Sequence, residues 1–160
     1  GTLGATGVDV ASTPACSGLP TGEVGTAGTG TVRVAVCGAH LSGLPLNHQL
    51  TSRGARLLAS PQSAPDYRLY ALAGGPVQRP GMVRVAEGGA AIALEVWEVP
   101  SALFGSFVAG IPAPLGIGKV KLDDGSEVPG FICEGLGISG ATDITHFGGW
   151  RAWLAAGAPR

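Results

Sequence analysis

The sequence predicts an α+β fold: a small, curved, mostly antiparallel β-sheet or barrel with two or three short helices. Three observations support this prediction. The chain of 160 residues is long enough to bury one hydrophobic core. Its 28 glycines and 12 prolines disfavour long helices. Its β-branched and alternating apolar runs are short, and glycine-containing turns separate them.

The first strand is predicted after a glycine-rich segment. Residues 1–30 hold eight glycines among Ser, Thr and Pro residues and show the period of neither a strand nor a helix. We therefore predict a flexible linker over residues 1–30 and one folded domain over residues 31–160. The run Thr31–Cys37 is apolar on both faces, as is typical of a strand in the middle of a sheet.

Five further strands follow from the pattern of apolar residues and turns. They are predicted over residues 67–72, 82–85, 91–99, 117–122 and 127–134. Glu87–Gly89 predicts a hairpin turn between the strands 82–85 and 91–99, because glycine readily takes the positive φ of such turns. Asp123–Gly125 predicts a second hairpin turn, between the last two strands.

Two short helices complete the predicted fold. One is expected over Ala102–Val108, between two proline-containing segments. The other is expected to contain Trp150 and Trp153, whose spacing places them on one face. Asp143 or Thr145 could cap this second helix.

Charge and cysteine content exclude several classes of protein. The formal net charge is −1 and no basic run is present, so we expect neither nucleic acid nor a membrane as a partner. Cys16, Cys37 and Cys133 lie far apart without a CxxC pair, which argues against disulfides and a metal site. We expect a cytoplasmic protein without cofactors. The mean hydropathy of +0.33 favours a surface that packs on another domain or subunit, and a homodimer is one possibility.

The glycine-bracketed loop Gly38–Gly43 contains the main catalytic candidate, His40. An imidazole can donate or accept a proton near neutral pH, and a loop that follows a strand is a common position for such a group. The alternative is a histidine that only hydrogen-bonds its own loop. If His40 is catalytic, its ring should face a pocket that also receives polar groups from residues 47–53.

The segment after this loop offers groups that suit a small polar anion. On an extended segment, Asn47, Gln49, Thr51 and Arg53 would share one face. Arg53 is of particular interest because a guanidinium binds a carboxylate through two parallel hydrogen bonds. The alternative is an ordinary exposed polar loop.

Two later segments contain further charged candidates. Glu95 and Glu98 point to opposite faces of a strand, so they are not a paired-carboxylate site, and a buried Glu95 would need a partner. Trp97 is expected in the core. Residues 111–120 superficially resemble a phosphate-binding loop but lack its closing GK[ST], so we predict no nucleotide site there. Lys119 is expected to face the cavity that its strand borders.

Residues 31–156 resemble the C-terminal domain of allophanate hydrolases and urea amidolyases. Segments similar to those of this family occur in order: Gly38–Asn47, Gln49–Thr51, Arg79–Gly81, Glu95–Pro100, Ile111–Val120, Gly130–Glu134, Asp143–Thr145 and Gly148–Arg151. The chain has a weaker resemblance to γ-glutamylcyclotransferase-like folds, at the loop Cys37–Leu41 and the strand Glu95–Val99. No Asp or Glu occurs from Val99 to Leu122, where a cyclotransferase would need its glutamate, so that activity is not expected.

The resemblance implies a place in the breakdown of allophanate. An amidase domain of the same chain would form N-carboxycarbamate, and the C-terminal domain would promote its decarboxylation, with His40 at the position of the family's histidine. The Ser, cis-Ser, Lys triad of the amidase domain has no match here. On chemical grounds Asn47, Gln49 and Arg53 are candidates to hold the substrate, and Glu95 and Lys119 complete the predicted set. The alternative is a non-catalytic module that positions or dimerises the amidase domain.

Overall fold

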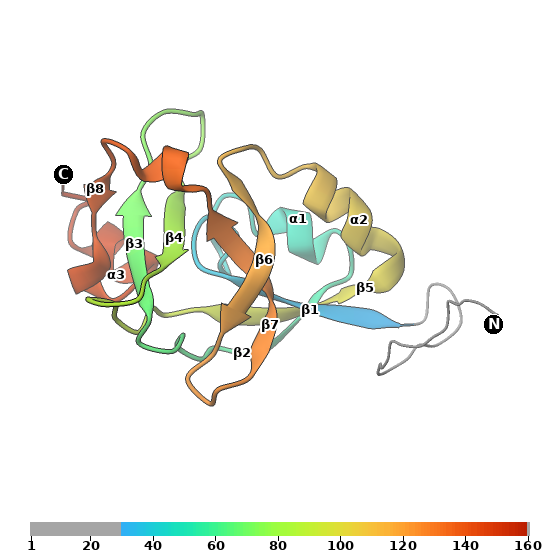
Figure 1. The fold of residues 1–160 in the computed structure, drawn as a ribbon. Helices are drawn as coiled ribbons and strands as arrows, with labels where there is room; N and C mark the ends of the chain where they lie inside the picture. Colours follow the sequence, from blue (N-terminus) through green and yellow to red (C-terminus); the bar gives the residue numbers. More distant parts are fainter. Residues whose placement is uncertain (1–29, 160) are drawn as a thin grey trace. The chain divides into compact units, whose positions relative to one another are not determined.

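The structure, a computed structural model, describes residues 30–159 (Figure 1). The predicted linker over residues 1–30 therefore lies outside the described residues, apart from Gly30. Residues 32–99 and 103–159 belong to one compact unit, and this unit contains every residue of the site described below.

Eight strands and three short helices confirm the predicted α+β class. The strands are Thr31–Val36 (β1), Arg56–Ala59 (β2), Tyr67–Ala71 (β3), Pro80–Arg84 (β4), Glu95–Pro100 (β5), Leu115–Lys121 (β6), Glu127–Cys133 (β7) and Thr142–Asp143 (β8). The helices are His48–Thr51 (α1), Ser101–Ala109 (α2) and Trp150–Ala155 (α3), with 3-10 turns at Gly135–Ile138 (η1) and Thr145–Phe147 (η2). None of the helices in the described part of the chain is long and apolar enough to cross a membrane.

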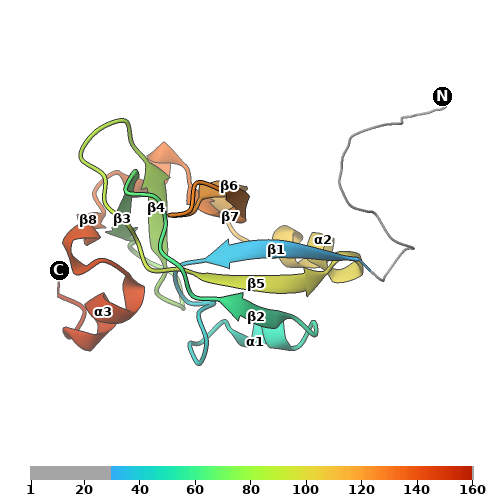
Figure 2. The same ribbon diagram turned by 90° about the horizontal axis from the view of Figure 1, so that it is seen from below.

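The larger sheet has five strands in the order β2-β5-β1-β7-β6 (Figure 2). The apolar run at Thr31–Val36 forms its middle strand, as predicted, and Val34 and Val36 are fully buried. β1 pairs with β7 in parallel, while β2 pairs with β5 and β6 with β7 in antiparallel fashion. The predicted hairpin between β6 and β7 is confirmed, and Gly125 has the positive φ of 89° that its turn requires.

The smaller sheet has three strands in the order β4-β3-β8. Its arrangement shows that the predicted hairpin at Glu87–Gly89 is wrong, because β4 pairs with β3 and β5 joins the other sheet. Residues 90–94 do not form a continuous strand. Instead, Ala90 donates its N–H to the carbonyl of Tyr67, and Gly89 lies so close to this backbone that a Cβ would be 2.6 Å from the carbonyl carbon of Asp66.

The two sheets approach each other at β4 and β7. A Cβ on Gly81 of β4 would lie 2.7 Å from the Sγ of Cys133 on β7, so the approach depends on glycine. The core between the elements is apolar and includes Trp97, as predicted, which is 5% exposed.

Helix α3 contains the buried pair Trp150 and Trp153 that the spacing predicted. Its N-cap is Gly149, so the predicted cap by Asp143 or Thr145 is wrong. Asp143 and Thr145 instead make hydrogen bonds within and near the turn that precedes the helix. The N–H of Thr145 donates to the Asp143 carboxylate, and the Thr145 hydroxyl accepts a hydrogen bond from the backbone of β3.

Candidate functional site

The loop that follows β1 places His40 in the interior. Gly38 makes this path possible, because a Cβ there would lie 2.3 Å from the ring of Pro80. His40 is only 5% exposed. Its imidazole packs against Phe131 with a centroid distance of 4.8 Å and edge-on against Phe107 at 5.4 Å. Two aromatic rings therefore fix the plane of the imidazole.

A single side chain from α1 holds one nitrogen of this ring. His40 Nε2 lies 2.8 Å from Gln49 Oε1. An amide oxygen only accepts hydrogen bonds, so Nε2 carries the proton and Nδ1 carries the lone pair. Burial lowers the pKa of His40 to about 4, although the hydrogen bond to Gln49 acts in the opposite direction and the charge of Arg79 adds to the lowering. The imidazole is therefore neutral at neutral pH.

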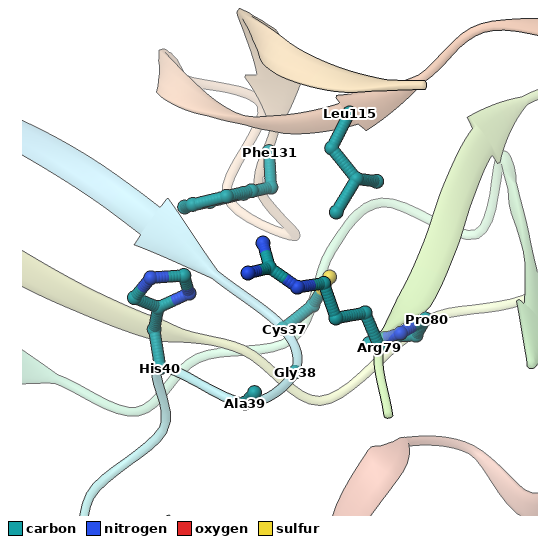
Figure 3. Close-up of a pocket in the computed structure, with 8 residues that line it drawn as sticks. All are labelled: Cys37, Gly38, Ala39, His40, Arg79, Pro80, Leu115 and Phe131. Carbon is teal, nitrogen blue, oxygen red and sulfur yellow. The ribbon is translucent and has the colours of Figure 1, made fainter. Parts of the chain in front are cut away.

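His40 borders a small cavity, but no residue from 47–53 lines it, so the predicted contribution of that segment to the pocket is wrong; Gln49 bonds only Nε2 of the ring. The cavity measures about 10 Å³, which is room for a single water molecule. Its lining consists of Cys37, Gly38, Ala39, His40, Arg79, Pro80, Leu115 and Phe131. In Figure 3 the guanidinium of Arg79 points toward the His40 ring, on the side where Nδ1 lies. The neutral His40 imidazole and the Arg79 cation therefore line one cavity whose other walls are apolar.

Arg79 was not a predicted site residue. Within residues 30–159 its guanidinium has no ion pair and no hydrogen-bond acceptor, although its side chain is half-buried. The segment Arg79–Gly81 does occur among the segments shared with the family. That signal points to the residue, but it does not show that the side chain reaches His40, because the two lie far apart in sequence.

The candidates from residues 47–53 are placed on a helix, so the predicted extended segment is wrong. The chain forms successive helical turns because Leu46 and Leu50, four residues apart, are both buried. Of the polar side chains, only that of Gln49 reaches the His40 ring. The Asn47 amide donates instead to the His40 carbonyl at 2.8 Å and fixes the loop. Arg53 lies over the Phe107 ring, 5.7 Å from its centroid.

Glu95 is buried and has the partners that burial demands. Its carboxylate accepts hydrogen bonds from the backbone and hydroxyl of Ser42, from the Trp97 indole and from the Arg151 guanidinium. Burial alone would raise the pKa of this carboxyl, but these donors outweigh it and hold the pKa below its usual value. Glu95 lines a separate cavity of about 430 Å³ with residues of α3.

The remaining candidates are not part of the His40 cavity. Lys119 is exposed on β6 and does not line the cavity. Glu98 forms an ion pair with Arg56 at 2.6 Å on the outer face of the sheet. In the described part of the chain, no group of His, Cys, Asp and Glu side chains could hold a metal ion.

Comparison with known proteins agrees with this arrangement. Residues 32–155 match the allophanate hydrolase C-terminal domain. A urea amidolyase from Lachancea kluyveri is 47% identical over 127 residues, which cover 77% of this chain and 7% of that protein.

Solved structures show the same relationship. The Kluyveromyces lactis allophanate hydrolase has a TM-score of 0.76 and 49% identity over 78% of this chain and 21% of its own. A uropathogenic E. coli-specific protein, c4763, has a TM-score of 0.73 and 37% identity over 78% of this chain and 96% of its own. This chain thus spans less than a tenth of the curated relative, and it belongs to the allophanate hydrolase C-terminal domain family.

Proposed function

We propose that this domain promotes the decarboxylation of N-carboxycarbamate, with His40 as the proton donor. The observation that supports this most directly is the geometry of the imidazole. Gln49 holds Nε2, two aromatic rings fix the plane, and Nδ1 lies toward a small cavity that the Arg79 guanidinium lines. The relatives' names, allophanate hydrolase and urea amidolyase, provide the chemical context.

The step we propose is a protonation coupled to bond cleavage. N-carboxycarbamate consists of two carboxylates joined through one N–H. His40 Nδ1–H gives its proton to this nitrogen, the bond between nitrogen and one carboxylate carbon breaks, and its electron pair stays on nitrogen. Carbon dioxide and carbamate leave, and water returns a proton to His40. The apolar walls of the cavity favour loss of the carboxylate charge as neutral carbon dioxide.

The lowered pKa of His40 fits this role once the substrate is present. In the free protein the imidazole is neutral, because burial opposes its charge. A bound dianion supplies the opposite charge and raises the pKa of the imidazole, so His40 takes up a proton when substrate arrives. The protonated His40 that acts as the acid would thus form only when the substrate is bound.

The partner in this proposal is an amidase domain, which would supply N-carboxycarbamate from allophanate. We place it in the same polypeptide, as the small share of the relatives that this chain spans suggests. The cytoplasm remains the predicted location of the protein, and a homodimer remains possible.

The proposal is tested by the rate of carbon dioxide release. The chain is mixed with an amidase-domain preparation and allophanate, and carbon dioxide is recorded continuously. The wild-type chain should increase the rate above that of the amidase domain alone. His40→Asn should reduce the increase about 100-fold, as general acid–base catalysis contributes roughly 100- to 10,000-fold.

His48→Asn is the matched control. His48 is exposed on α1 and donates Nδ1–H only to the Pro45 carbonyl, at 2.9 Å. This variant should release carbon dioxide like the wild type. If the wild-type chain adds nothing to the amidase domain, the decarboxylation proposal fails and the positioning module becomes the better reading.

A further inference from the structure

The His40 cavity is too small for the proposed substrate. Its volume of about 10 Å³ admits one water molecule, whereas N-carboxycarbamate has two carboxylates. A second cavity of about 420 Å³ lies next to it, lined by the connection between β3 and β4 and by Pro112–Pro114. Side chains that line the His40 cavity must therefore move before the substrate can reach the imidazole.

Two of these side chains border both cavities. Arg79 and Leu115 are the residues that line both the inner cavity and the outer one. Arg79 follows the connection Ala73–Gln78, which is exposed except at the half-buried Val77 and in which Gly74 and Gly75 both have a φ of +82°. A Cβ on Gly74 would meet no atom within 4 Å, so little packs against this connection. The segment that precedes Arg79 can thus adjust without disturbing the core.

The guanidinium of Arg79 is available for a ligand. In the described part of the chain no carboxylate pairs with it, and its half-buried position limits its access to water. An arginine in this setting binds a carboxylate through two charge-assisted hydrogen bonds. Its charge also acts on His40, whose pKa it lowers, so the two groups lie within electrostatic range.

We propose that Arg79 binds the substrate carboxylate that is retained and, with Leu115, forms the movable wall between the outer cavity and His40. This inference rests on the proposed function. Arg79 swings outward to receive the dianion in the outer cavity and returns with it to the inward position that Figure 3 shows. The retained carboxylate stays on the guanidinium, and the scissile carboxylate and the nitrogen lie against Phe131 and His40.

Malonate is a suitable probe, because it has a methylene group in place of the N–H and does not decarboxylate readily. Its binding to the chain is measured by calorimetry and by its effect on the His40 ring resonances. Arg79→Gln should weaken binding about 10- to 100-fold, the range expected when a charged bidentate contact is lost. Arg79→Lys keeps the charge and should give an intermediate loss. Leu115→Ala should accelerate association.

Arg33→Gln is the matched control, because Arg33 is exposed on β1 and the substitution removes the same charge. Its affinity should equal that of the wild type. Absence of malonate binding to the wild type, or equal binding by Arg79→Gln, would overturn the role of Arg79. An unchanged association rate in Leu115→Ala would overturn the movable wall.

Carbon dioxide release separates this inference from the proposed function. If malonate binding depends on Arg79 but His40→Asn releases carbon dioxide normally, the site binds dicarboxylates and the decarboxylation proposal is wrong. If His40→Asn releases carbon dioxide slowly but Arg79→Gln binds malonate as well as the wild type does, the decarboxylation proposal stands and Arg79 is not the carboxylate ligand.

Discussion

His40 combines full burial with a hydrogen bond to only one of its nitrogens. Phe107 and Phe131 pack against the ring and desolvate much of it, and Gln49 satisfies Nε2. Burial destabilises the charged imidazole more than the hydrogen bond to Gln49 stabilises it. The pKa of His40 therefore falls from 6.5 to about 4. The pH dependence near 6.5 expected of a free histidine is therefore shifted to more acidic pH.

This shift predicts a pH dependence of stability. Between about pH 4 and pH 6.5 the unfolded chain binds a proton at His40 that the folded chain does not, so the free energy of unfolding falls as the pH falls through this range. The loss attributable to His40 should be roughly 3 kcal/mol. Urea unfolding at several pH values measures it, and His40→Gln should remove this part of the dependence. A wild-type imidazole that titrates near 6.5 by NMR would contradict the prediction.

At the scale of elements, the close packing of β7 between its neighbours β1 and β6 depends on a glycine. A Cβ on Gly130 would lie 2.6 Å from a methyl group of Val120, 2.9 Å from the Cβ of Ala35 and 3.1 Å from the Ala35 carbonyl. These neighbours belong to the two adjacent strands and to a buried part of the sheet. The Val120 methyl could move by side-chain rotation, but the Cβ and carbonyl of Ala35 cannot withdraw without moving the backbone of β1.

Gly130→Ala should therefore lower the free energy of unfolding by about 1–3 kcal/mol, as expected for an overpacked core. Gly116→Ala on the adjacent strand β6 is the control, because a Cβ there meets no atom within 4 Å. Alanine also costs less conformational entropy than glycine, so this variant should be neutral or more stable by up to about 1 kcal/mol. Urea unfolding of both variants measures the difference, and equal effects would refute the steric argument.

At the scale of the whole folded unit, Glu95 joins segments that are distant in sequence. One carboxylate on β5 accepts hydrogen bonds from Ser42 in the His40 loop and from Arg151 on α3. Arg151 also donates to the Ser42 carbonyl at 2.6 Å. The loop that carries His40 is thus anchored to the strand behind it and to the last helix.

Glu95→Gln should lower the free energy of unfolding by about 1–3 kcal/mol, because an amide cannot accept from all these donors. The pKa of Glu95 is lowered in the folded state, so its contribution is present at neutral pH and is lost as the pH falls through that pKa. Glu127→Gln removes an exposed partner of Arg84 and should cost less than about 0.5 kcal/mol. Denaturation at neutral and acidic pH tests both; an equal effect of the two variants would count against the anchoring role.

Local chemistry allowed the sequence alone to predict much of this protein. The β-branched run of β1, the turn at Asp123–Gly125 and the buried tryptophans of α3 follow from short segments, because periodicity and turn residues act over a few positions. The family followed from the resemblance of several segments that occur in order along the chain. The sequence likewise singled out His40 and the need of a buried Glu95 for partners.

Only the tertiary structure decided which distant groups meet. It placed Arg79 beside His40, paired β4 with β3 instead of β5, and turned Gln49 toward the imidazole by winding α1 into a helix. Short-range patterns cannot reveal these outcomes, since burial of Leu46 and Leu50 and the close approach of Gly81 to β7 depend on packing between elements. The pKa of His40 is set in the same way, because desolvation belongs to the assembled core and not to the loop.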